Sequence, residues 1–133
     1  LFAERHFASV SIRDIGRAAE VISTVEQGLR HFGGSPGRKT ALAVACALVN
    51  DRTRAQMLFE QLQQDALHEY VPPYYLACVA AHLGDFEHAF GYLERAYQER
   101  SGWVPWLKLD PMADVLRHDV RFSDLLRRVG LKP

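Results

Sequence analysis

One apolar pattern occurs twice in this chain, at a fixed offset of 34 positions, and this repetition constrains the fold more than any other feature. Small, bulky and turn-forming residues of the first copy each fall on residues of the same kind in the second. The first copy contains Leu42, Ala43, Asn50, Asp51, Ala55 and Phe59, and the second contains Leu76, Ala77, Gly84, Asp85, Ala89 and Leu93. A period of this length is typical of stacked helical hairpins. The sequence therefore predicts an all-α fold of repeated hairpins.

The size and charge of the chain fit a single helical domain. A chain of 133 residues has the length of one domain, and it buries enough surface to fold without a metal or a disulfide. Its 16 basic residues (Lys and Arg) balance its 16 acidic residues (Asp and Glu), so no bulk positive field attracts nucleic acid or an anionic membrane. We therefore expect neither of these partners.

Three features bear on the cellular compartment. Cys46 and Cys78 both lie in apolar helical runs, where reduced thiols behave as small core residues, so we expect a reducing compartment, the cytoplasm. The longest apolar run, from Ala41 to Val49, is much shorter than the roughly 20 residues that a membrane-spanning helix requires. The N-terminus is too charged for a secretory signal and lacks an initiator Met, which suggests a piece of a longer protein.

The N-terminal third is predicted to contain two helices, over about residues 2–12 and 15–32. The second has the clearer pattern, because apolar residues recur at three- and four-residue steps on one face and polar residues occupy the other. That apolar face consists of Ile15, Ala18, Ala19, Ile22, Val25 and Leu29. One side of this helix is therefore expected to pack against the repeats.

Each repeat is predicted to be a helical hairpin with a defined corner. The first has helices over about residues 39–49 and 53–67, and the second begins at Pro72. At the corners, Asn50 and Gly84 suit a left-handed helix cap, and Asp51 and Asp85 suit the N-cap of the following helix. Small residues mark where the helices cross, Ala43 with Ala55 and Ala77 with Ala89.

The glycine-rich stretch before the first repeat, GGSPGRKT, invites comparison with a phosphate-binding loop. Arg38 stands where that motif requires its second glycine, and a helix rather than a strand precedes the stretch. We therefore interpret residues 33–40 as a turn between helices.

The repeat pattern is predicted to end at Arg100, because Ser101 and Gly102 interrupt the helix. Two shorter helices are expected after it, over about residues 111–117 and 120–129, the second with Asp119 as its N-cap. A stack of hairpins needs a terminal element with one apolar and one polar face, and this tail meets that need.

The two hairpins resemble tetratricopeptide repeats. The pattern of that family has a bulky and then a small residue in the first helix, a Gly-Asp-like corner, an early Ala in the second helix, and a bulky and then a small residue later. The residues that carry the resemblance are Leu42, Ala43, Asn50, Asp51, Ala55, Phe59 and Leu62, then Leu76, Ala77, Gly84, Asp85, Ala89, Leu93 and Ala96.

The chain departs from this pattern at Leu62, which is large where the family prefers a small residue, and at Ser101, which replaces the closing proline. The resemblance implies one domain over residues 1–133. Its parts are a degenerate hairpin at 1–34, repeats at 37–70 and 71–104, and a C-terminal cap at 105–133. The tail from Asp110 to Phe122 resembles the ends of repeat regions in multidomain bacterial regulators.

In that family the first helices of successive repeats line a concave groove that receives a peptide. Carried over residue by residue, the resemblance implies a groove lined by Thr40, Val44, Ala47, Leu48, Val71, Tyr74, Cys78, Ala81 and His82. The Lys, Arg and Asn residues with which some members grip a C-terminal carboxylate are absent from these positions, so an apolar or aromatic-bearing segment is the expected ligand. The alternative is that upstream helices or a second copy of the chain covers this face.

Other chemistry has weaker signals. Cys78 and His82 lie four apart on one helix, a spacing that can share a metal, but no spacing fixes further ligands nearby, and we predict no metal or cofactor. Trp103 and Trp106 are interpreted as a plug over the last hairpin rather than as a binding anchor. The arginines of the tail are interpreted as a solvated helix face.

The six scattered histidines and the capping carboxylates form no catalytic arrangement, so the sequence predicts no enzyme. The leading hypothesis is a non-catalytic module that binds a protein or peptide, or docks in cis or onto a second copy, within a larger regulatory protein. The alternative is a helical sensor that holds a small apolar ligand in the groove and regulates an attached output domain.

Overall fold

The structure is a computed structural model that describes residues 18–102 and 104–131, and in this part of the chain every regular element is helical. Five α-helices precede the C-terminal region, which contains two 3₁₀ turns and a last α-helix. In chain order they are α2 (Ala18–Phe32), α3 (Pro36–Leu48), α4 (Arg52–Asp65), α5 (Pro73–His82), α6 (Phe86–Gln98), η2 (Val104–Trp106), η3 (Pro111–Leu116) and α7 (Val120–Arg128). The prediction of an all-α fold is confirmed.

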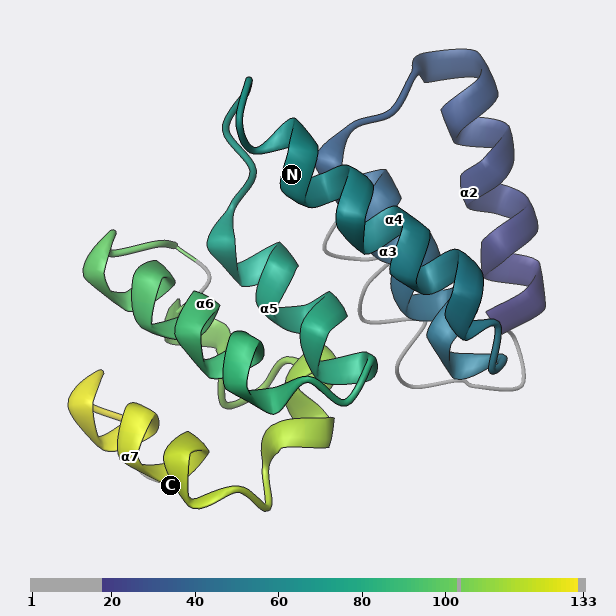
Figure 1. Ribbon diagram of the computed structural model, residues 1–133. Coiled ribbons are helices and arrows are strands. Elements are labelled where there is room, and N and C mark those ends of the chain that lie inside the picture. Colours follow the sequence, from purple (N-terminus) through teal and green to yellow (C-terminus); the bar gives the residue numbers. More distant parts are fainter. Residues whose placement is uncertain (1–17, 103, 132–133) are drawn as a thin grey trace.

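Three helices begin 34 residues apart, namely α4, α6 and α7, which start at Arg52, Phe86 and Val120. The repeat pattern was predicted to end at Arg100, but α7 begins one further interval after α6. Figure 1 shows the helices following one another in chain order, from α2 at one edge of the molecule to α7 at the other.

An aspartate begins three of these helices and explains the constant interval. The carboxylates of Asp51, Asp85 and Asp119 accept hydrogen bonds from backbone amides of the first turn, at 3.3, 3.2 and 2.9 Å respectively. Asn50 and Gly84, which precede Asp51 and Asp85, have the left-handed conformation, with φ of 65° and 81°. These groups satisfy amides and carbonyls that a helix end leaves free, so the predicted corner chemistry is confirmed.

The helices pack as hairpins, and the small residues expected at the crossings are buried. Helix α3 packs most closely on α4 and α5 on α6, while α3 also contacts α2 and α5. The four alanines predicted at the crossings, Ala43, Ala55, Ala77 and Ala89, are almost completely buried. A larger side chain at any of them would force the two helices apart.

The structure also gives the register of the N-terminal helix. Val21 and Val25 of α2 lie 34 positions before Ala55 and Phe59 of α4, and all four are buried. The helix predicted over residues 2–12 lies outside the described residues.

Two predicted boundaries differ from the structure. Helix α3 begins at Pro36, three residues before the expected start, because the Ser35 side chain accepts a hydrogen bond from the Arg38 amide at 3.2 Å and Pro36 suits the first turn. Residues 36–38, which were predicted to belong to the loop between two helices, thus form the first turn of α3. The helix expected over residues 111–117 is instead the 3₁₀ turn η3.

Candidate functional site

Most of the side chains that the resemblance assigned to a groove lie in the interior. Helix α3 stacks against α5, and η3 packs on α5. Those buried are Thr40, Val44, Val71, Tyr74, Cys78 and Ala81, while Leu48, His82 and Ala47 are half-buried. A peptide therefore cannot reach the buried six without displacing the elements that cover them.

The C-terminal segment, residues 104–116, packs on α5 through η3. From Leu107 onward every third residue is buried, namely Leu107, Asp110, Ala113 and Leu116. This is the repeat of a 3₁₀ helix, which has three residues per turn. The Tyr74 hydroxyl of α5 donates a hydrogen bond to Asp110 Oδ2 at 2.8 Å within this contact. The prediction that Trp106 plugs the last hairpin is wrong, because its side chain is 46% exposed, whereas Leu107 beside it is buried; Trp103 lies outside the described residues.

Three polar side chains lie on the covered face of α5. Burial raises the pKa of the Tyr74 hydroxyl and of the Cys78 thiol well above their ordinary values, so both stay protonated at neutral pH. His82 Nδ1 lies 2.8 Å from the Cys78 carbonyl oxygen, which can only accept, so this nitrogen carries the proton of the neutral ring. The Cys78 thiol is protonated, and the Nδ1 proton of the neutral His82 ring is donated to a backbone carbonyl. This arrangement offers no activated nucleophile.

His82 Nε2 is buried and makes no hydrogen bond within the described residues. Burial lowers the pKa of this imidazole, against the raising effects of the Cys78 carbonyl and of the Asp114 and Asp110 carboxylates. In the described ranges, no three His, Cys, Asp or Glu side chains are placed together so as to hold a metal ion.

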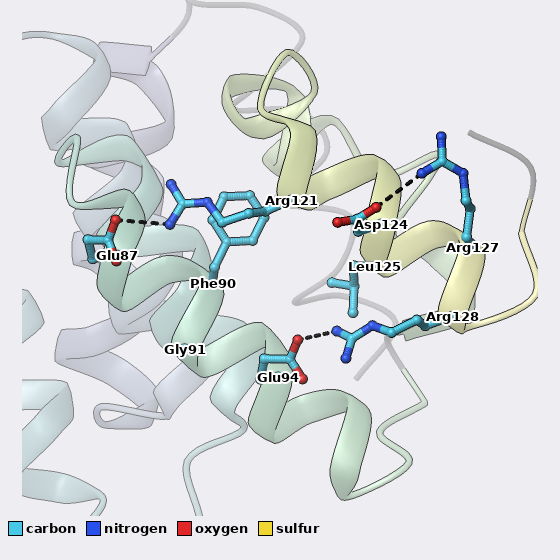
Figure 2. A pocket seen from close by; sticks show the side chains of 9 residues that line it. All are labelled: Glu87, Phe90, Gly91, Glu94, Arg121, Asp124, Leu125, Arg127 and Arg128. Carbon is cyan, nitrogen blue, oxygen red and sulfur yellow. Dashed lines mark hydrogen bonds and ion pairs between the residues drawn. The ribbon is translucent and has the colours of Figure 1, made fainter.

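An open cleft of about 710 Å³ lies between α6 and α7. Both helices present one stripe to it, at steps of three, four and seven residues. Its lining, called here the α6–α7 cleft, consists of Glu87, Phe90, Gly91 and Glu94 of α6 with Arg121, Asp124, Leu125, Arg127 and Arg128 of α7. Figure 2 shows these side chains from both helices around a common space.

Two ion pairs cross the cleft and define its length. Arg121 Nη1 lies 3.0 Å from Glu87 Oε1, and Arg128 pairs with Glu94. On each helix the two paired residues are seven positions apart, or about 10 Å along the axis. Figure 2 shows both pairs bridging the helices, with a third pair, Arg127 with Asp124, within α7.

The arginines that bridge the cleft remain charged and held in place. Hydrogen bonds raise the pKa of Arg121, from Asp119 first and then from Glu87, and the hydrogen bond to Glu94 raises that of Arg128. The Arg121 guanidinium carbon lies 4.5 Å from the centre of the Phe90 ring, within the range of a cation–π contact. The Arg121 guanidinium thus lies against the Phe90 ring while it pairs with Glu87.

The base of the cleft is apolar, and the α6 side of the cleft has no side chain at Gly91. Phe90 is 7% exposed and Leu125 is 3% exposed, and both belong to the main core. Gly91 has no side chain, and a Cβ added there would meet no heavy atom within 4 Å. The room in the cleft therefore lies beside Gly91, between the two ion pairs.

This cleft was not predicted, because the arginines of the tail were interpreted as a solvated helix face. One signal was present. Glu87 and Arg121 are 34 positions apart, and so are Glu94 and Arg128, which is the offset of the repeat itself. Opposite charges at the repeat offset indicate a bridge between successive helices.

The comparisons with known proteins assign no family to the chain. No family model matches it, and neither a curated protein nor a solved structure matches it. Among the described residues, every helix is too short or too polar to cross a lipid bilayer.

Proposed function

We propose that this chain is a non-catalytic helical-repeat module of the tetratricopeptide type, that it binds a protein or peptide, and that the α6–α7 cleft is its binding site. The observation that carries the proposal is the contrast in access: the groove implied by the resemblance is largely buried, whereas the cleft is open. An apolar base with charged groups at its edges is the usual composition of a site that recognises a peptide side chain and its neighbours.

The context proposed is an intracellular regulatory protein of which this module is one part. Cys46 and Cys78 are both free and buried, which supports a reducing compartment such as the cytoplasm. A neutral balance of charges supports a protein partner over a nucleic acid or an anionic membrane.

The test is a peptide-display selection against the wild-type chain, followed by calorimetry with individual peptides. Gly91→Leu fills the space beside Gly91 and is expected to abolish binding. The matched control is Met57→Leu, since Met57 lies 34 positions earlier on α4 and is 64% exposed. Selected peptides that bind Gly91→Leu as well as they bind the wild type would refute the assignment of the site.

A small apolar ligand is a second candidate, favoured by the volume of the cleft. About 710 Å³ is within the range of roughly 300–1,000 Å³ that small-molecule sites occupy. A thermal-shift screen tests it: a compound that raises the melting temperature of the wild type and of Met57→Leu, but not of Gly91→Leu, would support a sensor role.

A further inference from the structure

The first helix of each repeat is buried on all sides over most of its length. Every residue of α5 from Pro73 to Ala81 is buried, and so is every residue of α3 from Thr40 to Cys46. Helix α3 packs against α2, α4 and α5, and α5 packs against α3, α4, α6 and η3. Each of these helices is therefore packed against both an earlier and a later element of the chain.

The C-terminal segment has the equivalent place one repeat later, but it is not buried on all sides. It follows α5 at the repeat offset of 34 positions, as α7 follows α6. Leu109 is 66% exposed, whereas Tyr75, its counterpart in α5, is buried. Val115 is 41% exposed, whereas its counterpart Ala81 is buried. The stack thus ends on a surface whose counterpart in the preceding repeat is packed against other elements.

Three apolar side chains share this exposed side. Trp106, Leu109 and Val115 each come one position before a buried residue of the segment, so at three residues per turn they lie along a second side of it. This side is called here the apolar edge. Of the eight large apolar side chains that are exposed among the described residues, three belong to it. A terminal element of a repeat stack normally presents a polar surface to water, so an apolar one is typical of an interface.

We propose that two copies of this chain associate through the apolar edge, so that the C-terminal segments of the two copies pack against each other. An apolar surface is complementary to itself, and contact between identical surfaces gives a closed dimer with a two-fold axis. The contact continues the series in which α5 packs on α3 and η3 packs on α5. None of the three residues lines the α6–α7 cleft, so the inference is separate from the proposed peptide site.

The charged residues of the segment lie beside the apolar edge rather than in it. Lys108, Asp114 and Arg117 fall at three-residue steps on the remaining side. Asp114 Oδ1 pairs with Arg117 Nε at 2.6 Å, so opposite charges lie together there. Two approaching copies therefore bring apolar side chains into contact. Three side chains from each copy make a small interface, so we expect a weak dimer that dissociates on dilution.

The test is sedimentation velocity of the wild-type chain at concentrations from about 1 μM to 1 mM, the range in which we expect a small interface to dissociate. The mass should rise from 15.1 kDa toward twice that value as the concentration increases. A chain that stays monomeric at the highest concentration would overturn the inference.

A substitution in the edge is compared with the same substitution elsewhere. Leu109→Glu places a carboxylate in the contact and should keep the chain monomeric throughout the range. The matched control is Leu67→Glu, since Leu67 is 72% exposed outside the edge, and this variant should dimerise like the wild type. Gly91→Leu should also dimerise normally, because Gly91 lies in the cleft. Equal dimerisation of the two glutamate variants would contradict the proposed contact.

Dilution of the ¹⁵N-labelled wild type locates the contact without any substitution. The Leu109 and Val115 amide resonances and the Trp106 indole resonance should shift with concentration, and the Leu67 amide resonance should not. Since a two-fold contact uses the same surface on both copies, the shifts should map to one surface. Shifts on two separate surfaces would indicate a head-to-tail contact, and shifts that leave Leu109 and Val115 unchanged would exclude the edge. Either result would overturn the proposed dimer.

Discussion

Helices α5 and α6 form one hairpin, and the C-terminal region covers each of them in a different way. On α5 the C-terminal segment packs through η3 and through the buried hydrogen bond between Tyr74 and Asp110, and four of its side chains are buried at three-residue steps. On α6 the next element, α7, is joined through two ion pairs that leave a cleft between them. Apolar contact closes a surface, whereas long charged side chains hold two helices together and leave space.

The difference has a consequence for function. The face of α5 is where the resemblance implied a ligand, and it is occupied by the chain's own segment. The open surface lies between the second helices, where the sequence predicted only solvent. In a stack this short, the element that ends the repeat decides which face remains available.

The largest expected effect is at the closed face. Leu107 of the C-terminal segment is 1% exposed and belongs to the main core, so Leu107→Ala should destabilise the protein by about 2–5 kcal/mol through lost burial and a residual cavity. Urea unfolding followed by circular dichroism measures it. The control is Arg127→Ala at the edge of the cleft, which should change stability by less than about 0.5 kcal/mol. Similar losses for the two variants would erase the distinction between closed face and open cleft.

The fold could be predicted from the sequence wherever local chemistry and the long-range pattern agree. The corners at Asn50-Asp51 and Gly84-Asp85 were predicted because the left-handed cap and the N-cap are local properties, and the alanines expected at the crossings are buried. Residues 111–117 were mispredicted as an α-helix, whereas their buried positions, Ala113 and Leu116, are three residues apart, as in the 3₁₀ turn η3.

The site was harder to predict for a different reason. Whether Tyr74 and Cys78 line a groove depends on which segment docks on α5, and no local signal in either residue reveals that. The charge bridges were predictable in principle, since Glu87 and Arg121 share the repeat offset. The open space beside Gly91 could not be predicted. A glycine inside a helix can mark either an open cleft or a close contact with another helix, and the sequence does not distinguish the two.

A second comparison uses two positions on the same helix. Ala89 is completely buried at the crossing with α5, so Ala89→Leu should destabilise by about 1–3 kcal/mol through overpacking. At Gly91 the same side chain enters open space and replaces a poor helix former, so Gly91→Leu should stabilise by about 0.5–1 kcal/mol. Thermal and urea unfolding check both. A destabilising Gly91→Leu would mean that the cleft is not open.

A third prediction concerns pH at the closed face. Burial lowers the folded-state pKa of His82 below its ordinary value of 6.5, with Cys78, Asp110 and Asp114 as the groups that face it. As the pH falls below 6.5, the unfolded chain takes up a proton that the folded chain still excludes, so stability should decrease until the folded pKa is reached. Urea unfolding at pH 7.5 and at pH 5.5 should show a smaller difference in His82→Gln than in the wild type. The same difference in both would contradict the assignment.

The smallest expected effect is at the bridges of the open cleft. Glu87 and Arg121 are exposed enough that water and salt screen their attraction, so a double-mutant cycle with Glu87→Gln and Arg121→Gln should give a coupling of about 0.2–1 kcal/mol. The coupling should fall when NaCl is raised from 0.05 to 0.5 M, because the Debye length shortens. Glu60→Gln on α4 is a control for the loss of an exposed carboxylate on a second helix. A coupling well above 1 kcal/mol that salt does not reduce would mean that the pair is desolvated. The α6–α7 cleft would then be closed in solution, and the contrast with the face of α5 would disappear.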